Sequence, residues 1–564
     1  MHFRRTSGSE SFQVQFQFDH PPLNVSREFN FSRRLSENLD AFVDRMRNNI
    51  DKVLSKRKAR RQKKTGSPVL DEACSDLQIV LSSQGSPVAG TLKCEDIFFN
   101  GDTSNLVFHI CDKSYTVVVN SPWVKCLSLP SVVMVGFPAY PNKIHIIFGD
   151  MKTSKYFWYA ATQEEFKKGK WREVGTDMVY VPVEGDVGCK LKFECIPSDG
   201  ALDGVKTELV TKTEVQLGPG TCPFETRHQY TKNHLDNDSF RIVSYNILAE
   251  FYTETEVARN EMFSHCPVDA LSLDYRKQLY LKELFGYNAD IICLQEVDQK
   301  VFNFDLQYMF NKRDMNGIYS LKTGAVNEGI AIFYSTKKFR LKDSYSVVLA
   351  EEIDTNPIFS HIWETIKDNK IVVDNFKSKP TVMLILVLEP VGVEGEVLIV
   401  GNIHMYYSPD KEYIRLLQGG MFLSLIDHVA KNVVKSVPGI RPSVVMCGDF
   451  NSSPECGLYA LMTTGHIPDD IGDWKCDENE MVSGLTLRHP YSISSAYGTP
   501  EYTNLTANFS GCLDYIYFQN DALLLKQVVP LPSDEEVKKH VALPNIEFPS
   551  DHLALVADFG WKKC

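Results

Sequence analysis

The spacing of apolar and polar positions predicts different structures along the chain, beginning with a short N-terminal segment. Apolar residues occupy every second position of residues 12–18, which predicts a half-buried strand. Residues 33–58 are predicted to form one amphipathic helix, because apolar side chains recur there at helical spacing, at Leu35, Leu39, Phe42, Met46, Ile50 and Val53. A basic run at residues 56–64 has the composition of a solvated linker. We expect residues 1–68 to form this strand, helix and linker.

A β-rich accessory domain is expected at residues 69–220. Its apolar runs are short and are separated by Gly, Pro, Asn and Asp, without long helical patterns. The strand candidates are residues 77–81, 106–119, 132–135, 144–148 and 189–195. This pattern is typical of a β-sandwich. His109 and His145 fall inside strand patterns, so we interpret them as core or edge residues.

Beyond about residue 240 apolar strands alternate with helical segments, which predicts an α/β domain over residues 221–564. The expected helices are residues 275–284 and 414–434. The expected strands are residues 241–246, 289–296, 397–404, 444–449, 512–517 and 553–556. The pattern places the polar residues that follow these strands at the borders of one sheet.

Composition favours a multidomain protein with a polarised charge. The chain has 564 residues, of which 43% are hydrophobic, enough for several cores. No apolar run approaches the roughly 18 residues of a membrane span, and residues 1–10 lack the apolar middle of a secretory signal. Residues 1–68 carry 15 Lys and Arg against 7 Asp and Glu, although the whole chain has a net charge of −12. The basic run is either a solvated linker or a nucleic-acid or targeting segment.

Polar side chains of related chemistry follow the strands of the α/β region. Asp449 and Asn451 lie two positions apart, so a strand end would point both toward the same face. The set as a whole is Asn246, Glu296, His404, Asp449, Asn451, Asp514, Asp551 and His552. Each residue alone also fits a turn, a cap or a satisfied core position. Together they suit a divalent cation beside a phosphate, since carboxylates bind Mg²⁺ while His and Asn bind phosphate oxygens.

These motifs resemble the endonuclease/exonuclease/phosphatase superfamily with the DNase I-like fold. The elements SYN, LQE, H, GDFN, LDY and SDH follow the order of that family over residues 240–564. Within it, YNILAE, GDFNSSP, YTN and GCLDYIY resemble the deadenylase branch. GPGTCPF, YTKN and LPSDEEV resemble a subfamily that degrades 2′,5′-oligoadenylates and trims poly(A) in mitochondria. The resemblance implies a four-layer α/β sandwich in which two mixed sheets pack face to face between helices.

The resemblance also implies a role for each motif residue, with Mg²⁺ as cofactor and Mn²⁺ as a substitute. Glu296 is implied as the principal metal ligand, with Asn246, Asp449, Asn451 and Asp551 around the metal. Asp449 would orient or deprotonate the attacking water, and Asn451 would hold the scissile phosphate. His552 would stabilise its charge and Asp514 would orient His552, while His404 contacts the phosphate from the opposite side.

The resemblance further implies an adenylate substrate, in the form of poly(A) RNA or 2′,5′-oligoadenylate, and a mitochondrial matrix location with the cytoplasm as alternative. Pro409 and Phe509 match the residues that sandwich adenine, and Asn504 is a candidate base-edge contact. Two positions depart from the branch pattern, since Ile403 replaces a usual Thr and Tyr407 a usual Trp. Abasic endonucleases and inositol-phosphate phosphatases, which share the metal site, and a catalytically dead RNA-binding scaffold remain alternatives.

Overall fold

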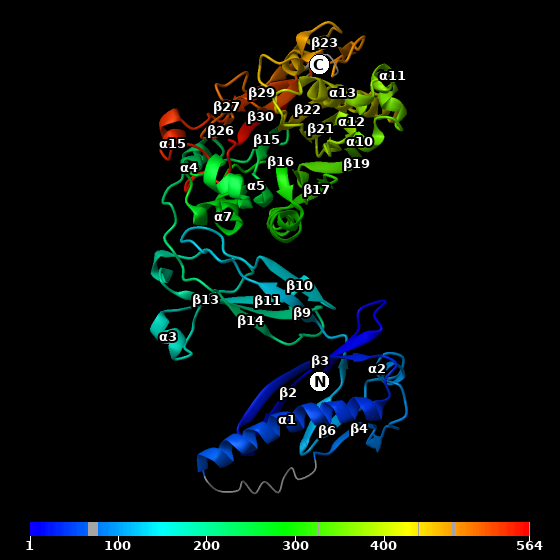
Figure 1. The fold of residues 1–564 in the computed structure, drawn as a ribbon, viewed down its shortest axis with the longest axis vertical. Helices are drawn as coiled ribbons and strands as arrows, with labels where there is room; N and C mark the ends of the chain where they lie inside the picture. The colour runs from blue at the N-terminus through cyan, green and yellow to red at the C-terminus, as the bar shows by residue number, and fades with distance from the viewer. Residues whose placement is uncertain (66–76, 325, 438, 476–479, 563–564) are drawn as a thin grey trace.

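The computed structural model describes residues 1–65, 77–324, 326–437, 439–475 and 480–562, and three units follow one another along its long axis (Figure 1). The first unit has two four-stranded sheets, ordered β3-β2-β1-β8 and β5-β4-β6-β7. Its elements are β1 (His2–Arg4), β2 (Ser11–His20), β3 (Val25–Arg34), α1 (Leu39–Thr65), β4 (Ile79–Ser83), β5 (Ser86–Pro87), α2 (Cys94–Phe98), β6 (Leu106–Ile110), β7 (Lys113–Thr116) and β8 (Val118–Val119).

Helix α1 differs from its prediction at both ends. Residues 33 and 34 complete strand β3, and the Asn38 side chain caps the helix by accepting a hydrogen bond from the Ala41 N–H at 2.9 Å. At the other end α1 continues to Thr65, so the expectation of a linker at residues 56–64 is wrong. Lys and Arg are good helix formers, and a basic run therefore extends a helix that hydrophobic spacing alone would end earlier.

The first core joins residues from both sides of the boundary expected at residue 68. Phe3, Phe12 and Phe42 pack against Phe98 and Phe108 in one buried cluster that extends from Met1 to Val117. The boundary itself lies outside the described residues, but the buried residues before it and after it form a single core. A division at residue 68 is therefore wrong for this core. We propose residues 1–119 as the first folding unit.

The second unit is the β-sandwich expected of the accessory domain, in a shorter range of the chain. A two-stranded sheet, β10-β9, and a four-stranded sheet, β12-β11-β13-β14, surround a core that includes the fully buried Trp158. The elements are β9 (Trp123–Ser128), β10 (Lys143–Ile147), β11 (Asp150–Ala161), α3 (Gln163–Lys167), β12 (Arg172–Gly175), β13 (Lys190–Ser198) and β14 (Thr207–Val210). Residues 132–135, predicted as a strand, form only an isolated bridge from Met134 to Gln216.

The third unit contains two six-stranded sheets, ordered β17-β18-β16-β15-β30-β29 and β19-β20-β21-β22-β28-β25. The first sheet consists of β15 (Ser239–Asn246), β16 (Ile291–Asp298), β17 (Met315–Leu321), β18 (Glu328–Ser335), β29 (Leu523–Val528) and β30 (Leu555–Trp561). The second sheet consists of β19 (Phe339–Val348), β20 (Val382–Pro390), β21 (Glu396–His404), β22 (Arg441–Asp449), β25 (Ile493–Ser495) and β28 (Asp514–Gln519). The predicted α/β strands are all present, with shifted ends.

Helices flank the two sheets and short strand pairs occupy the loops. The helices are α4 (Pro223–Arg227), α5 (Glu250–Glu254), α6 (Val268–Leu271), α7 (Leu273–Gly286), α8 (Gln299–Val301), α9 (Gln307–Asn311), α10 (Leu349–Glu352), α11 (Ser360–Ile366), α12 (Lys370–Lys377), α13 (Glu412–Ser436), α14 (Gly457–Thr464) and α15 (Asp534–Lys538). The short pairs are β23 (His466–Ile467) with β24 (Leu487–Arg488), and β26 (Asn504–Leu505) with β27 (Ser510–Gly511).

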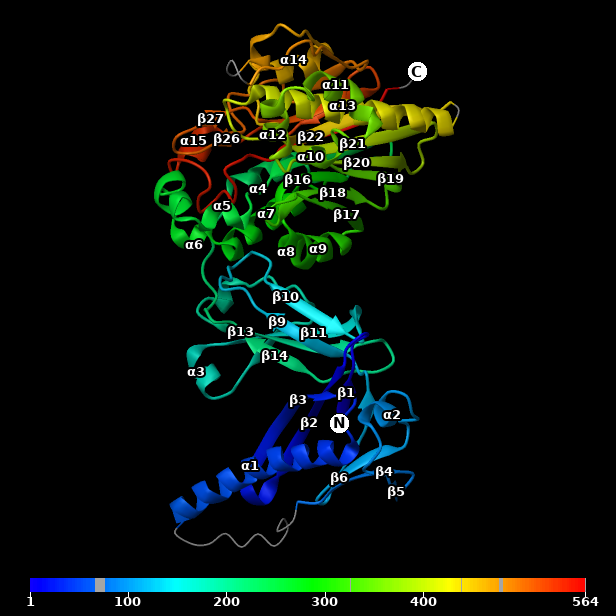
Figure 2. The ribbon, with the colours of Figure 1, turned by 45° about the vertical axis from the view of Figure 1, so that its right-hand side comes forward.

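The third unit has four layers, helix, sheet, sheet and helix (Figure 2). One core lies between the two sheets and contains apolar side chains from both, for example Ile242 and Cys293 from the first and Leu398 and Cys447 from the second. Separate cores lie on the outer faces, where α7 and α9 cover the first sheet and α13 covers the second. Because the strands are buried on both faces, they appear in the sequence as continuous apolar runs.

Helix α7 also forms part of the contact between the second and third units. Its Asp274 accepts hydrogen bonds from the Ser131 N–H at 2.6 Å and from the Asn142 side chain at 2.7 Å. Its buried Lys277 donates to Asn142 at 2.7 Å and to Asp305 at 3.0 Å. A buried charge needs such partners, so the accessory unit completes the polar environment of α7.

The buried ion pair between Arg241 of β15 and Asp558 of β30 generates the first prediction. It is bidentate, at 2.7 and 2.9 Å, and joins neighbouring strands of the first sheet. Asp558→Ala leaves the guanidinium buried without its partner, so we expect the free energy of unfolding of the third unit to fall by about 3–5 kcal/mol. Urea denaturation measures it.

The matched control is Asp203→Ala, which removes an exposed pair with Lys155 at 2.6 Å. Solvent screens that pair, and its loss should change the free energy of unfolding by less than about 1 kcal/mol. Equal effects of the two substitutions would contradict a stabilising role for the buried pair.

Candidate active site

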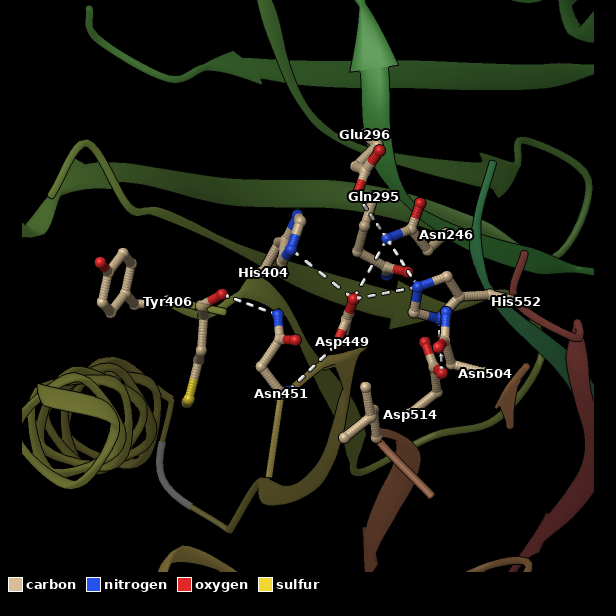
Figure 3. Close-up of polar contacts among 12 residues, drawn as sticks. Asn246, Gln295, Glu296, His404, Tyr406, Asp449, Asn451, Asn504, Asp514 and His552 are labelled. Carbon is tan, nitrogen blue, oxygen red and sulfur yellow. Dashed lines mark hydrogen bonds and ion pairs between the residues drawn. The ribbon is translucent and has the colours of Figure 1, made fainter. Parts of the chain in front are cut away.

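The polar residues predicted at strand ends meet at one edge of the two facing sheets (Figure 3). In the second sheet, His404 of β21 lies opposite Asp449 of β22, and Asp449 lies opposite Asp514 of β28. In the first sheet, Asn246 at the end of β15 lies opposite Gln295, the residue before Glu296. The register of each sheet therefore places its functional side chains on adjacent strands.

Asp449 lies at the centre of this group and is buried. Its Oδ1 accepts a hydrogen bond from the Asn451 N–H at 3.0 Å, and its Oδ2 accepts one from Asn246 Nδ2 at 3.1 Å. The same Oδ2 lies 3.6 Å from Nε2 of His404 and 3.6 Å from Nε2 of His552. One carboxylate oxygen is therefore flanked by two imidazole nitrogens at a distance beyond a direct hydrogen bond.

Acidic residues favour a positive charge on His552. Its Nδ1 lies 2.8 Å from Oδ2 of Asp514, which also accepts a hydrogen bond from Thr503 Oγ1 at 2.6 Å. Burial opposes the charged ring, but Asp514, Asp449 and Asp551 outweigh it and raise the pKa of His552 well above its usual value. Burial, with a further contribution from Asp514, in turn raises the pKa of Asp449. The arrangement resembles an acid-oriented imidazolium next to a carboxylate of increased basicity.

His404 has the opposite environment on the other side of Asp449. Burial, Lys322 and the charge of His552 together lower the pKa of His404 well below its usual value. The Lys322 ammonium lies 3.2 Å from His404 Nδ1 and 2.6 Å from Oε1 of the buried Glu328. Lys322, Glu328 and Thr503 were not predicted as site residues. Lys322 directly follows strand β17 and Glu328 is the first residue of strand β18, so a hairpin that pairs these strands is the sequence signal that could have brought the two together.

Glu296 lies on the opposite side of Asn246 from Asp449. Its carboxylate accepts hydrogen bonds from Asn246 Nδ2 at 2.9 Å and from the Ala249 N–H at 3.0 Å. Burial together with the negative charges of Asp551 and Glu328 raises the pKa of Glu296 to about 7. Carboxylates that repel one another in this way are stabilised by a cation.

The backbone is strained at the same place. Glu296, Asn451 and Leu248 adopt the left-handed conformation, with φ of 53°, 49° and 58°. Asn tolerates this region, but Glu and Leu rarely adopt it, so each adds a conformational cost. Such strain concentrates at functional sites, where the surrounding structure holds it.

The side chains fit a divalent cation on the side of Glu296. Oδ1 of Asp551 is buried and has no hydrogen-bond partner in the described part of the chain, whereas its Oδ2 accepts a hydrogen bond from Asn504 at 3.2 Å. A cation would satisfy the free oxygen and the ionised Glu296 together. Asp449, Asp514 and His552 also hold ligand atoms within 4.8 Å of one another. There, however, Asp514 already accepts from His552 and Thr503, which leaves that trio less suited to a metal.

The residues expected to contact adenine lie in three different environments. Phe509, at the β26–β27 turn, is 49% exposed, which excludes a core role. Pro409 is exposed in the segment between β21 and α13, where its carbonyl accepts a hydrogen bond from Arg415. Asn504 is buried, and its amide donates to Asp551, so it supports the carboxylate instead of lining a base-binding surface. Asn451 donates its side-chain amide to the Met405 carbonyl at 3.0 Å.

Comparison with known families assigns the third unit. The model of the Endonuclease/Exonuclease/phosphatase family matches residues 243–552, a range that contains every strand-end residue described above. The chain belongs to this family. The model of the 2′,5′-phosphodiesterase 12-like N-terminal domain matches residues 121–216, which correspond to the second unit. The two six-stranded sheets between helices are the DNase I-like α/β sandwich implied by the sequence motifs.

The similarity to some relatives covers more of the chain than the family model does. The protein named 2′,5′-phosphodiesterase 12 from Rattus norvegicus is 39% identical over 472 residues, which cover 81% of this chain and 76% of that protein. Its Homo sapiens counterpart is 38% identical over the same shares. The CCR4-Not complex 3′-5′-exoribonuclease subunit Ccr4 from Mycosarcoma maydis is 28% identical over 59% of this chain and 52% of its own.

Solved structures of two other proteins match part of the chain. ANGEL2, a 2′,3′-cyclic phosphatase in complex with adenosine-2′,3′-vanadate, matches with a TM-score of 0.47 and 26% identity, covering 58% of this chain and 96% of that one. The human Nocturnin catalytic domain with bound sulfate matches with a TM-score of 0.38 and 21% identity, covering 58% of this chain and 96% of that one.

The raised pKa of Glu296 generates the second prediction. Its folded-state pKa of about 7 exceeds the ordinary value of 4.5, so the ionised carboxylate destabilises the fold, fully above pH 7 and progressively less toward pH 4.5. Without metal, Glu296→Gln should therefore raise Tm relative to the wild type at about pH 8, and the difference should shrink at about pH 5.5. Adding Mg²⁺ should raise the wild-type Tm more than that of the variant.

Thermal unfolding with chelator or with Mg²⁺, at both pH values, measures these differences. Glu164→Gln is the control, since the Glu164 side chain is 86% exposed. A variant that responds to Mg²⁺ as strongly as the wild type would exclude Glu296 as a ligand.

Proposed function

We propose that this protein is a Mg²⁺-dependent phosphodiesterase and 3′-exoribonuclease that hydrolyses 2′,5′-linked oligoadenylates and 3′,5′-linked poly(A), releasing AMP. The observation that carries the proposal is the position of Asp449 Oδ2, 3.6 Å from both His404 and His552. A carboxylate base between two groups that can bind phosphate suits the hydrolysis of a phosphodiester. The names of the relatives, a 2′,5′-phosphodiesterase and a 3′-5′-exoribonuclease, support the same chemistry.

Each side chain has a role in this proposal. Asp449 orients the attacking water and accepts its proton, a step that its raised pKa favours. Cationic His552, oriented by Asp514, stabilises the negative charge that develops on the phosphate. His404 contacts the phosphate from the opposite side of Asp449, and Asn451 holds it with the amide hydrogen not used by Met405.

Glu296, Asn246, Asp449, Asn451 and Asp551 would hold the metal in this proposal, with Glu296 and Asp551 among its charged ligands. Mg²⁺ is the cation that suits carboxylate and carboxamide oxygens with retained waters, and Mn²⁺ takes the same ligands. When bound, the ion would polarise the scissile phosphate and neutralise part of its charge. The unpartnered Oδ1 of Asp551 supports this assignment.

Exposed Phe509 supports an adenylate substrate, since an exposed ring in the turn after Asn504 and Leu505 of β26 is available to stack on a base. We assign Phe509 and Pro409 to the adenine site and Asn504 to support of Asp551.

We further propose that the protein acts on RNA in the mitochondrial matrix, an inference that rests on the family resemblance. Among the described residues, no helix is both long and apolar enough to cross a bilayer.

The function is tested with the full-length protein and oligoadenylates of both linkages, in the presence and absence of Mg²⁺. We expect AMP from both substrates only with the metal. Asp449→Asn and Glu296→Ala should each lower kcat by at least about 10²-fold, the usual cost of losing a general base or a metal ligand. AMP release is quantified, and a cooperative thermal unfolding transition shows that each variant is folded.

Other outcomes separate the alternatives. Cleavage of abasic DNA or of inositol phosphates in place of oligoadenylate would assign the chain to another activity of the same fold. If the intact protein binds poly(A) but does not hydrolyse it, the alternative of a catalytically dead RNA-binding scaffold would be favoured. Near-normal turnover by a folded Asp449→Asn protein would remove Asp449 from its role.

The adenine assignment generates a separate prediction for Phe509→Ala. Loss of one stacked base contact costs about 1–3 kcal/mol, so activity on oligoadenylate should fall by about 10- to 100-fold. Hydrolysis of a small activated phosphodiester without a base should stay unchanged, because the catalytic groups do not contact the ring. Steady-state kinetics on both substrates measures the difference.

Phe166→Ala is the matched control, since it removes an aromatic ring that is 40% exposed in the second unit. It should affect neither substrate. If Phe509→Ala reduces both activities in parallel, the adenine assignment is wrong.

A further inference from the structure

Lys322 lies directly behind His404, in the segment between β17 and β18. Its side chain is only 13% exposed, although lysine is rarely buried without a partner. Nζ lies 2.6 Å from Oε1 of Glu328 and 3.2 Å from Nδ1 of His404. Neither contact is explained by the hydrolytic roles described above.

The contact with His404 determines which ring nitrogen carries the proton. A charged ammonium has three N–H donors and no lone pair, so it can only donate to His404, and Nδ1 must accept. A neutral imidazole that accepts at Nδ1 carries its hydrogen at Nε2. Nε2 is the nitrogen that lies 3.6 Å from Asp449 Oδ2, on the side where the phosphate is proposed to bind.

Glu328 pairs with the Lys322 ammonium and fixes its position. Its side chain is 1% exposed and forms an ion pair with Lys322, while its Oε1 also lies 3.4 Å from the Tyr252 hydroxyl. Since the ion pair is internally neutral, it directs a donor at His404 with little net charge. The three residues come from separate segments, α5, the β17–β18 turn and β18, which fixes the ammonium from several directions.

His552 provides the comparison within the same site. Its Nδ1 faces the acceptor Asp514, whereas Nδ1 of His404 faces the donor Lys322. The two rings present Nε2 to the same oxygen of Asp449 and differ in the residue behind them. An acid behind the ring favours a hydrogen on both nitrogens, and a lysine behind it favours one hydrogen, on Nε2.

We propose that Lys322 is a positioning residue that holds His404 as the neutral tautomer with its hydrogen on Nε2, so that His404 donates a hydrogen bond to the phosphate. The phosphate contact rests on the proposed function, whereas the tautomer does not. In this arrangement His552 supplies positive charge, and His404 supplies a directed donor without a second full charge beside it.

The tautomer is tested first, on full-length protein labelled with ¹⁵N-histidine. The His404 signals are assigned by their loss in His404→Gln. We expect an unprotonated Nδ1 and a protonated Nε2 in the wild type, and transfer of the hydrogen toward Nδ1 in Lys322→Met. A wild-type His404 protonated at Nδ1, or an unchanged His404 spectrum in Lys322→Met, overturns the proposal whether or not the protein hydrolyses oligoadenylate.

Kinetics tests the consequence. Lys322→Met should lower kcat on oligoadenylate by about 10- to 10²-fold, somewhat less than the loss of a transition-state donor itself. KM should change little, and Lys322→Arg should restore most of kcat because it keeps the N–H donor. Lys367→Met, which removes an exposed lysine at the end of α11, is the matched control and should leave kcat unchanged.

Lys322→Met also leaves Glu328 buried without its cation, so a second variant separates that effect. Lys322→Met combined with Glu328→Gln removes the unpaired charge and should recover Tm without recovering kcat. Recovery of kcat in this double variant, or failure of Lys322→Arg to restore it in a folded protein, would show that Lys322 acts through stability alone. A wild type inactive on oligoadenylate with the expected tautomer would reject the proposed function and not the tautomer.

Discussion

Mutual repulsion among buried carboxylates is the constraint that the catalytic unit has to satisfy. The group consists of the buried Glu328, Asp449, Asp514 and Asp551 and the half-buried Glu296, which converge at one edge of the two sheets, where solvent stabilises their charge only weakly. Several different partners compensate these charges. Lys322 pairs with Glu328, His552 with Asp514, and the Asn246 amide bridges Glu296 and Asp449. Glu296 and Asp551 retain the least compensation, which is why the cation is assigned to them.

The same constraint explains why two chemically identical histidines behave differently. His404 and His552 lie at the same distance from Asp449, so their difference arises from the residues behind them. When the surroundings move the pKa values of two neighbouring groups apart, the two groups can take different acid and base roles. Here Asp514 favours a positively charged His552 ring. Lys322 favours a neutral His404 ring that donates a hydrogen bond.

Much of this site could be predicted from the sequence because strand ends carry a simple signal. An apolar run followed by a polar residue predicts both the strand and the direction of the side chain, and Asn246, Glu296, His404 and Asp449 follow that pattern. Lys322 does not, since it lies in a turn and reaches the site only through the pairing of β17 with β18. Its role depends on a contact 82 positions away, which periodicity along the chain cannot predict.

Asn504 was assigned to the wrong environment for a related reason. Thr503 and Asn504 are adjacent, and successive residues of an extended chain point to opposite sides. Thr503 therefore supports Asp514, and Asn504 supports Asp551. The motif marks a segment that lies beside these two acids, but it does not show which side chain faces which acid. The first domain boundary was misplaced because composition marks solvated segments, whereas a core is defined by long-range packing such as that of Phe42 on Phe98 and Phe108.

Helix α7 connects the active site with the accessory unit, because two adjacent residues on it contact these two parts of the molecule. Arg276 is fully buried and donates to the carbonyls of Ile247 and Leu248, the segment whose next N–H, that of Ala249, binds Glu296. Lys277 donates to Asn142 of the accessory unit. The strained backbone at Leu248 is therefore held by a charged side chain of α7, whose next residue is held in turn by the accessory unit. A strained loop keeps its conformation only when its surroundings fix it, and here these surroundings include the second unit as well as the two sheets.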